Sequence, residues 1–306
     1  MTTLVFGHKS PDTDSTGSPI IWAWWLNTIM GIDAKPVLLG EPNTEALFML
    51  DHWKLDKPEI ITDVADGQRV VIVDTNNPAE LPANINNADI IAIIDHHALI
   101  GGLKTKGPIH IVIEPLACTA TIMWKIIGKD MAQMPENIKG AMLTCILSDT
   151  LEFRSPTTTQ EDKAIAWSLA ESLGIDIPTY AAQMFAAKSD VSSFSEAELL
   201  RMDSKEYEVG GKQFRVSVLE TTSPASVLSR KDALMAAMPA VATEDGADQV
   251  LLFVVDILNE EATMLIPNAL SKTVAEKSFG ATVTGDKVVL PGIMSRKKQI
   301  IPFLTV

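Results

Sequence analysis

Two short apolar runs, Val70–Val73 and Ile90–Ile94, constrain the fold of this chain more than any other feature. Neither run alternates with polar residues, which is typical of strands that are buried on both faces of a parallel sheet. The first run ends at Asp74, and the second ends at Asp95-His96-His97. Because ligands bind outside the carboxyl ends of the strands in an open α/β sheet, we expect a functional site at these ends.

Residues 1 to about 188 alternate between strand and helix patterns, which predicts parallel pairing with right-handed crossovers. We expect five strands in this part of the chain, at Thr3–Gly7, Lys35–Leu39, Arg69–Asp74, Asp89–Asp95 and Ile109–Ile113.

The helices of this part have recognisable end signals. Ser18 as N-cap and Pro19 at the first helical position predict a helix that runs to about Met30, with Gly17 allowing a tight turn before it. Asn43 predicts the cap of a helix that runs to about Trp53. Three further helices are expected, the last with Gly174 as its C-cap: Thr119–Ile127, Glu136–Ser148 and Gln160–Leu173.

At 306 residues the chain favours two domains. The polar, serine-rich stretch around residues 189–195 is the candidate linker, so we expect an N-terminal domain over residues 1–188 and a smaller α+β domain over residues 196–306. The second domain shows a hairpin turn, three strands and one helix, at Gly210-Gly211, Arg215–Glu220, Gln249–Asp256, Ala262–Ile266 and Ala225–Met238.

The composition limits the compartment and the partners. The net charge of −14 argues against nucleic acid as a partner, because phosphate backbones attract basic surfaces. The longest apolar stretch, Ile20–Leu26, is far shorter than the roughly 20 residues that cross a bilayer, and no signal peptide is expected. The only two cysteines, Cys118 and Cys145, favour a reducing cytoplasm.

A candidate metal-binding group follows the first strand. His8, Asp12 and Asp14 offer an imidazole nitrogen and carboxylate oxygens, which suit Mn²⁺, Fe²⁺, Co²⁺, Zn²⁺ or Mg²⁺. The alternative is that Asp12 and Asp14 are ordinary turn and capping residues. The same alternative holds for Asp74, since an aspartate after a strand is often a cap.

The second candidate group is more specific. Adjacent histidines at a strand end point to opposite sides, so His96 is expected to bind metal while His97 faces a ligand. Asp149 ends an apolar helix and by itself would be only a terminal polar residue. Together these positions predict two cations about 3.5–4 Å apart, bridged by a carboxylate and a water that becomes a hydroxide for attack on phosphorus.

The densest basic run of the chain is Ser295-Arg296-Lys297-Lys298. Such a run near a C-terminus is usually a solvated tail. Beside a two-metal site it favours binding of an anion, because arginine grips phosphate with two hydrogen bonds and lysine acts as a point charge.

These residues resemble a known family. The strings His8-x-x-x-Asp12-x-Asp14, Asp74, Asp95-His96-His97 and Ser148-Asp149-Thr150 are similar to the DHH phosphoesterase superfamily. The run from Ser295 to Gln299 resembles the family II, manganese-dependent inorganic pyrophosphatases, which carry a DHHA2-type C-terminal domain. The resemblance covers essentially the whole chain.

The resemblance implies roles for individual residues. The first metal would be bound by His8, Asp12 and Asp74, and the second by Asp14, Asp74, His96 and Asp149, with Asp74 bridging. His97, Lys205, Arg296 and Lys297 would contact pyrophosphate; Lys205 is implied by the resemblance alone.

The resemblance also implies an enzyme that hydrolyses inorganic pyrophosphate to two phosphates in the cleft between its domains. Two Mn²⁺ ions per subunit are implied, with Co²⁺ as a substitute and additional Mg²⁺ arriving with the substrate. A homodimer through the N-terminal domain is implied as well.

Two alternatives remain. Another DHH-type phosphoesterase, such as an exopolyphosphatase or a nanoRNA or nucleotide phosphatase, is disfavoured because the last hundred residues contain no histidine. A non-catalytic metal- or phosphate-binding module is disfavoured because His97 and the basic run add little to metal storage.

Overall fold

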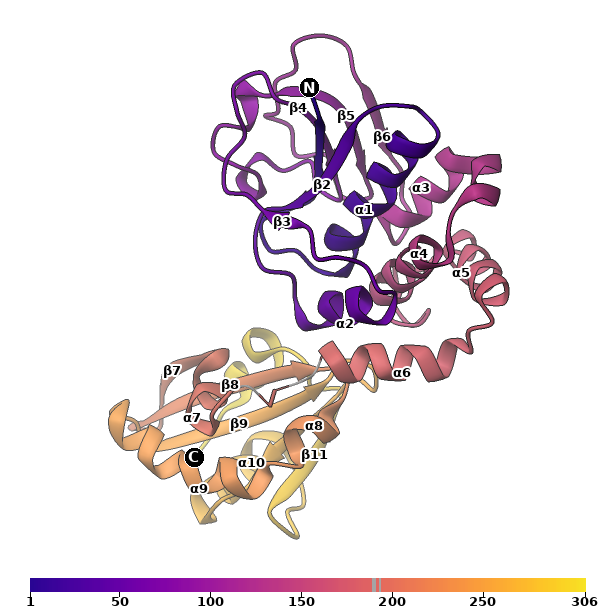
Figure 1. The fold of residues 1–306 in the computed structure, drawn as a ribbon. Helices are drawn as coiled ribbons and strands as arrows, with labels where there is room; N and C mark the ends of the chain where they lie inside the picture. The colour runs from indigo at the N-terminus through magenta and orange to yellow at the C-terminus, as the bar shows by residue number, and fades with distance from the viewer. Residues whose placement is uncertain (189–190, 193) are drawn as a thin grey trace. The chain divides into compact units, whose positions relative to one another are not determined.

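The computed structural model describes residues 1–188, 191–192 and 194–306, and it divides into two compact units, Met1–Ala187 and Lys188–Val306 (Figure 1). Positions 189, 190 and 193 of the expected linker lie outside the described residues. Within the described ranges, no helix has the length and the apolar character needed to cross a membrane.

The first unit is built on a six-stranded sheet with the strand order β3-β2-β1-β4-β5-β6. Every neighbouring pair is parallel, so the predicted parallel α/β sheet is confirmed. The strands are β1 (Thr3–Phe6), β2 (Ala34–Leu38), β3 (Glu59–Ile60), β4 (Arg69–Val73), β5 (Asp89–Asp95) and β6 (His110–Ile113). The two-residue strand β3 was not predicted.

The strand order reverses between β1 and β4, because β1 is followed by β2 on one side and β4 continues the sheet on the other. This is the topological switch point of a doubly wound sheet, where the loops after two adjacent strands diverge and leave a crevice. The first unit therefore offers a ligand site at the carboxyl ends of β1 and β4.

The helices of the first unit largely match the sequence predictions. The predicted N-cap Asn43 and the predicted left-handed C-cap Gly174 (φ 66°) are both present, and a capping box of Thr159 with Asp162, which was not predicted, begins α5. The helix α6 was not predicted. The α-helices are α1 (Thr13–Thr28), α2 (Thr44–His52), α3 (Thr119–Ile127), α4 (Glu136–Asp149), α5 (Gln160–Leu173) and α6 (Ile177–Lys188), with short 3₁₀ turns at Pro78–Glu80, Ile85–Asn87 and Gly128–Gln133.

The predicted start of α1 at Ser18 was wrong. The helix begins at Thr13, because the Asp12 side chain accepts a hydrogen bond from the Ser15 backbone N–H (2.9 Å) and acts as the N-cap. Pro19 lies inside the helix, where its missing N–H forfeits one backbone hydrogen bond. Gly17 makes no turn. A Cβ there would lie 2.4 Å from the Cys145 sulfur, so glycine permits the close packing of α1 on α4.

The second unit contains a five-stranded mixed sheet with the order β11-β10-β9-β8-β7. All eight residues of β9 are buried, and alternate residues pack into two apolar clusters on opposite faces of the sheet. Helices α7, α8 and α9 supply one cluster, and α10 with the C-terminal segment supplies the other. The strands are β7 (Ser204–Val209), β8 (Lys212–Thr221), β9 (Gln249–Asp256), β10 (Glu261–Leu265) and β11 (Lys287–Pro291).

Two local predictions in this unit had different outcomes. Gly210 and Gly211 form the predicted hairpin turn between β7 and β8, both with positive φ (59° and 75°). The single helix predicted over 225–238 is two helices, interrupted at Ser229 and Arg230. The helices of the unit are α7 (Glu196–Met202), α8 (Pro224–Leu228), α9 (Lys231–Glu244) and α10 (Ala269–Phe279), followed by short turns at Arg296–Ile300 and Ile301–Phe303.

Candidate metal centre

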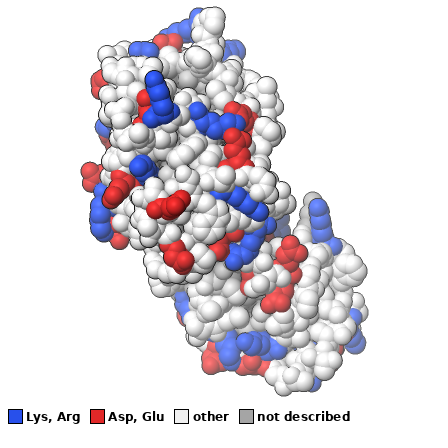
Figure 2. Space-filling model, turned by 90° about the vertical axis from the view of Figure 1, so that its right-hand side faces the viewer, with Lys and Arg blue, Asp and Glu red and all other residues white. Residues whose placement is uncertain are grey.

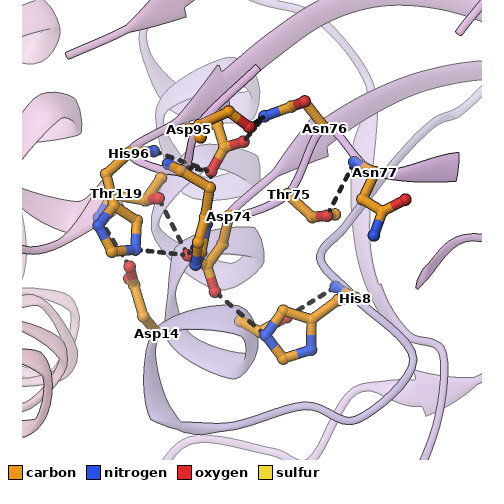
Figure 3. Close-up of polar contacts among 12 residues, drawn as sticks. His8, Asp14, Asp74, Thr75, Asn76, Asn77, Asp95, His96 and Thr119 are labelled. Atoms are coloured by element: carbon orange, nitrogen blue, oxygen red, sulfur yellow. Dashed lines mark hydrogen bonds and ion pairs between the residues drawn. The ribbon is translucent and has the colours of Figure 1, made fainter. Parts of the chain in front are cut away.

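Histidine and aspartate side chains converge at the switch point of the first unit, as Figure 3 shows around Asp74. His8 follows β1, Asp74 follows β4, and His96 follows β5. Residues at the ends of two helices complete the centre. Asp12 and Asp14 lie at the start of α1, and Asp149 is the last residue of α4.

The first candidate group comprises His8, Asp12 and Asp74, whose ligand atoms lie within 4.8 Å of one another. The Nε2 atom of His8 is 3.6 Å from Oδ2 of Asp12 and 3.5 Å from Oδ2 of Asp74. The structure thus brings together the three residues expected to bind the first metal.

The second candidate group comprises Asp14, His96 and Asp149, also within 4.8 Å of one another. The Nε2 atom of His96 lies 3.3 Å from Oδ1 of Asp74, while the other oxygen of Asp74 faces His8. Asp74 therefore lies between the two groups, where a bridging carboxylate would be expected. The Nδ1 atom of His96 is 3.2 Å from the Leu116 carbonyl oxygen, a contact that leaves Nε2 free to bind metal.

The carboxyl groups of this centre fit a cation. Burial, together with the charges of Asp14 and Asp12, raises the pKa of Asp74 well above its usual range, and the same causes raise the pKa of Asp149. The Oδ2 atom of Asp149 is buried and has no hydrogen-bond partner among the described residues. A divalent cation would neutralise the negative charge of these clustered carboxylates. Imidazole nitrogen together with carboxylate oxygen is a donor set suited to Mn²⁺.

Hydrogen bonds orient the acidic side chains. Thr119, at the start of α3, donates from its backbone N–H to Asp14 (2.7 Å) and from its hydroxyl to Asp74 (3.1 Å). Ser18 donates to the other oxygen of Asp14 (2.7 Å). Asp74 itself has a left-handed backbone (φ 57°), which is uncommon for residues other than glycine and is found where function fixes a side chain.

The loop that carries His8 is held by close packing. The His8 backbone N–H donates to the hydroxyl of Ser15 in the first turn of α1 (2.8 Å). A Cβ at Gly7 would lie 2.0 Å from that hydroxyl oxygen, so the contact requires glycine at this position. The end of β1 and the start of α1 are thereby fixed against each other.

His97 forms a third candidate metal group with Asp74 and His96, but its nearest acidic partner is Asp95. Its Nδ1 atom lies 2.8 Å from Oδ1 of the fully buried Asp95, and this hydrogen bond raises the pKa of His97. Burial would raise the pKa of Asp95, but hydrogen bonds from His97 and from Asn76 (2.6 Å) outweigh it and leave that pKa lowered. Because Nδ1 is engaged, Nε2 of the half-exposed His97 ring is the nitrogen available to a ligand.

In the second unit, Lys205 and Arg296 line one cavity of about 570 Å³, together with Asp203, Tyr207 and Glu220. Arg296 is held by Asp203, whose carboxylate lies 2.7 Å from Nη2 and whose backbone carbonyl accepts from Nη1 (2.8 Å). The side chain of Lys297 lies outside the described part of the chain.

Sequence reasoning missed several residues of both sites. Thr119 and Asp203 act through contacts with residues far away in the chain, whereas Ser15 contacts the nearby His8 and Asp12. Asp95 was recognised only as part of its motif.

Known protein families and relatives match nearly the whole length of the chain. Residues 2–149 match the model of the DHH family, N-terminal domain, and residues 182–306 match that of the DHHA2 domain. A probable manganese-dependent inorganic pyrophosphatase of Deinococcus radiodurans is 40% identical over 306 residues, covering 98% of this chain and 96% of that protein. One of Lactobacillus acidophilus is 35% identical over 304 residues, covering 99% and 97% respectively.

Two solved structures are similar. A putative family II inorganic pyrophosphatase of Methanococcus jannaschii has a TM-score of 0.63 and 33% identity, covering 98% of this chain and 97% of that chain. An exopolyphosphatase-related protein of Bacteroides fragilis has a TM-score of 0.52 and 13% identity, covering 98% and 89%, so it shares the fold.

Proposed function

The chain belongs to the family of manganese-dependent inorganic pyrophosphatases, and we therefore propose that it hydrolyses inorganic pyrophosphate to two phosphates. The resemblance inferred from the sequence is confirmed. The observation that carries the proposal is the convergence of His8, Asp74 and His96, with three further aspartates, into two adjoining candidate metal groups at the switch point.

We propose that Mn²⁺ ions are held by six side chains, two ions per subunit, with Co²⁺ able to replace them and Mg²⁺ entering with the substrate. Bound there, manganese would supply Lewis-acid charge that activates water and neutralises phosphate oxygens. Two adjoining donor groups support this stoichiometry, because Asp74 of the first lies 3.3 Å from Nε2 of His96 in the second. The proposed ligands are His8, Asp12, Asp14, Asp74, His96 and Asp149.

His97 is proposed to donate a hydrogen bond to the substrate from Nε2. Asp95 holds the opposite ring nitrogen, so the ring has one orientation and one free donor. Since the same contact raises the pKa of His97, more of the imidazole is protonated near neutral pH and able to donate. This donor would stabilise charge that develops on phosphate oxygens.

Lys205, Arg296 and Lys297 are proposed to bind the pyrophosphate anion. The shared cavity of Lys205 and Arg296 supports their joint action, and Asp203 holds the guanidinium of Arg296 in place. Residues 1–188 would thus form the metal-binding catalytic domain, and residues 196–306 the substrate-binding domain.

A homodimer through the first unit is also proposed. The strand β6 lies at the edge of the sheet, and large apolar side chains are exposed on it and in the loop before it: Ile111 (54%), Leu99 (72%) and Ile100 (63%). Pairing of this edge with a second copy would cover them.

The substitution Ile111→Glu should give a monomer in light scattering, because it places a charge on the proposed interface. The control Trp167→Glu changes an equally exposed side chain on α5 and should leave a dimer. A dimeric Ile111→Glu variant would contradict this interface.

A cytoplasmic location is proposed for the protein. The cysteines Cys118 and Cys145 are both free and buried, which suits a reducing compartment.

The decisive experiment measures phosphate release by protein stripped with EDTA and then supplied with Mn²⁺. Pyrophosphate should be hydrolysed rapidly, while tripolyphosphate, a nucleoside monophosphate and a short oligonucleotide should be poor substrates. Preferential release from tripolyphosphate would favour the exopolyphosphatase alternative, whose support is the shared fold of the Bacteroides fragilis protein. Release from none of them would contradict the proposed function.

A further inference from the structure

Glu45 is a fully buried acidic residue that belongs to none of the three candidate metal groups. It lies in the first turn of α2, directly after the N-cap Asn43 and Thr44. A buried carboxyl group is unfavourable unless it is hydrogen-bonded, so its partners should reveal what the residue does.

The Oε2 atom of Glu45 joins two segments that carry proposed metal ligands. It accepts a hydrogen bond from the hydroxyl of Thr13 (2.9 Å) and another from the hydroxyl of Ser148 (2.7 Å). Thr13 lies between Asp12 and Asp14, and Ser148 directly precedes Asp149. One oxygen atom thus links the start of α1 to the end of α4.

The backbone before Glu45 strengthens the same link. The backbone N–H of Asn43 donates to the Pro11 carbonyl oxygen (3.0 Å). A Cβ at Gly40 would lie 2.3 Å from the Lys9 carbonyl oxygen, so this segment packs directly on the loop that leads to Asp12. The entry to α2 therefore fixes the ligand-bearing loop from several sides.

We propose that Glu45 is a positioning residue that sets the separation of Asp14 and Asp149 required for Mn²⁺ binding at the second group. This inference rests on the proposed function. Neither Asp14 nor Asp149 shares an element with β4 or β5, so their distance from each other depends on how α1 and α4 are held together. A metal centre tolerates displacements of only about 0.5 Å, and Glu45 bonds to the immediate neighbours of both ligands.

The test measures the two Mn²⁺ dissociation constants by titration, following free Mn²⁺ by electron paramagnetic resonance. Glu45→Ala should weaken Mn²⁺ binding about 10- to 100-fold, the usual effect of removing a residue that orients metal ligands. Glu45→Gln, which keeps an acceptor oxygen, should restore binding to within a few-fold of the unmodified protein. The control is Glu41→Gln, whose exposed side chain pairs with Lys57 (2.6 Å) and should have no effect.

Two smaller changes keep the test valid if Glu45→Ala does not fold. Ser148→Ala and Thr13→Val each remove one hydroxyl donor. Each should weaken Mn²⁺ binding while the unfolding temperature of the metal-free protein changes little, an outcome that a purely stabilising role would not give. Where Glu45→Ala does fold, adding either change to it should have little further effect, since all act through one oxygen atom.

The failure of this inference can be told apart from failure of the proposed function. Unchanged Mn²⁺ constants in folded Glu45→Ala, or in both hydroxyl variants, would overturn the positioning role while the unmodified enzyme still hydrolyses pyrophosphate. A protein that neither binds Mn²⁺ nor hydrolyses pyrophosphate before any substitution would refute the proposed function itself.

Discussion

At the scale of single residues, the side chains proposed to hold cations differ from those proposed to hold the anion. Asp74 is buried and Asp149 is largely enclosed, and burial together with neighbouring carboxylates raises the pKa of both, so their clustering is unfavourable without positive charge. Hydrogen bonds from Thr119 fix two of the acids before any ion arrives. His97 lies 3.9 Å from Asp74, but its nearest partner is Asp95 at 2.8 Å, and its other ring nitrogen, Nε2, is left available to a ligand.

The substitution His97→Gln should therefore separate binding from turnover. We expect kcat to fall by roughly 10²–10³, the usual effect of losing one donor that stabilises transition-state charge, while the Mn²⁺ constants remain unchanged. The control is His52→Gln, an exposed histidine of α2. Steady-state rates and Mn²⁺ titration provide the measurement, and an unaltered kcat would remove His97 from the mechanism.

The substitution Asp203→Ala tests whether Arg296 of the second unit binds the substrate. Loss of the carboxylate frees the Arg296 guanidinium to leave its position, so the KM for pyrophosphate should rise roughly tenfold, as expected for one charge-assisted hydrogen bond. Arg296→Ala should raise KM further, and neither change should alter Mn²⁺ affinity. The exposed Asp232→Ala serves as the control. A lower Mn²⁺ affinity with an unchanged KM would contradict the assignment of Arg296 to substrate binding.

At the scale of helices and strands, the sequence predicted elements whose signals are local. Continuous apolar runs predicted β4 and β5, the N-cap Asn43 predicted the start of α2, and Gly174 predicted the end of α5. The start of α1 was misplaced because Ser18-Pro19 imitates a helix entry, whereas the cap is the proposed metal ligand Asp12.

For the candidate site too, only residues with a local sequence signal could be expected in advance. Ligands that end strands could be predicted, because the carboxyl ends of parallel strands meet at one edge. Glu45, Thr119 and Asp203 could not, because each acts on residues that only the tertiary fold brings near.

The ion-pair cluster that joins α7, β8 and the end of α9 gives a pH-dependent prediction. Hydrogen bonds from Arg201, and the nearby charge of Arg215, lower the pKa of Asp245. A carboxyl group with a depressed pKa stabilises the folded state above its unfolded pKa of about 3.9, and this contribution is lost as the pH falls through the folded pKa.

Asp245→Asn should accordingly lower the free energy of unfolding of the second unit at about pH 7, and the difference should shrink as the pH falls through the lowered pKa of Asp245. Urea denaturation followed by circular dichroism at several pH values measures this. The exposed Glu208→Gln is the control. A difference that stays constant with pH would show that the ion pairs do not account for the loss.

At the scale of the whole molecule, the proposed metal ligands are confined to one unit while charged side chains are not (Figure 2). The net charge is −14, and on the face drawn in Figure 2 lysine and arginine side chains are scattered among acidic ones. Attraction of a small anion must then come from local clusters such as Lys205 with Arg296. All six proposed metal ligands lie in the first unit.

Mn²⁺ should therefore stabilise the first unit selectively. All six tryptophans lie between Trp22 and Trp167, so tryptophan fluorescence reports the unfolding of this unit alone. At free Mn²⁺ about 100 times the dissociation constant, its free energy of unfolding should rise by about 2.7 kcal/mol per ion bound. Hydrogen exchange of the β9 amides, in the core of the second unit, should stay unchanged. Asp149→Asn is the matched control and should reduce the stabilisation by Mn²⁺ that tryptophan fluorescence reports. If Mn²⁺ slowed hydrogen exchange in β9 to the same extent, the confinement of metal binding to the first unit would be contradicted.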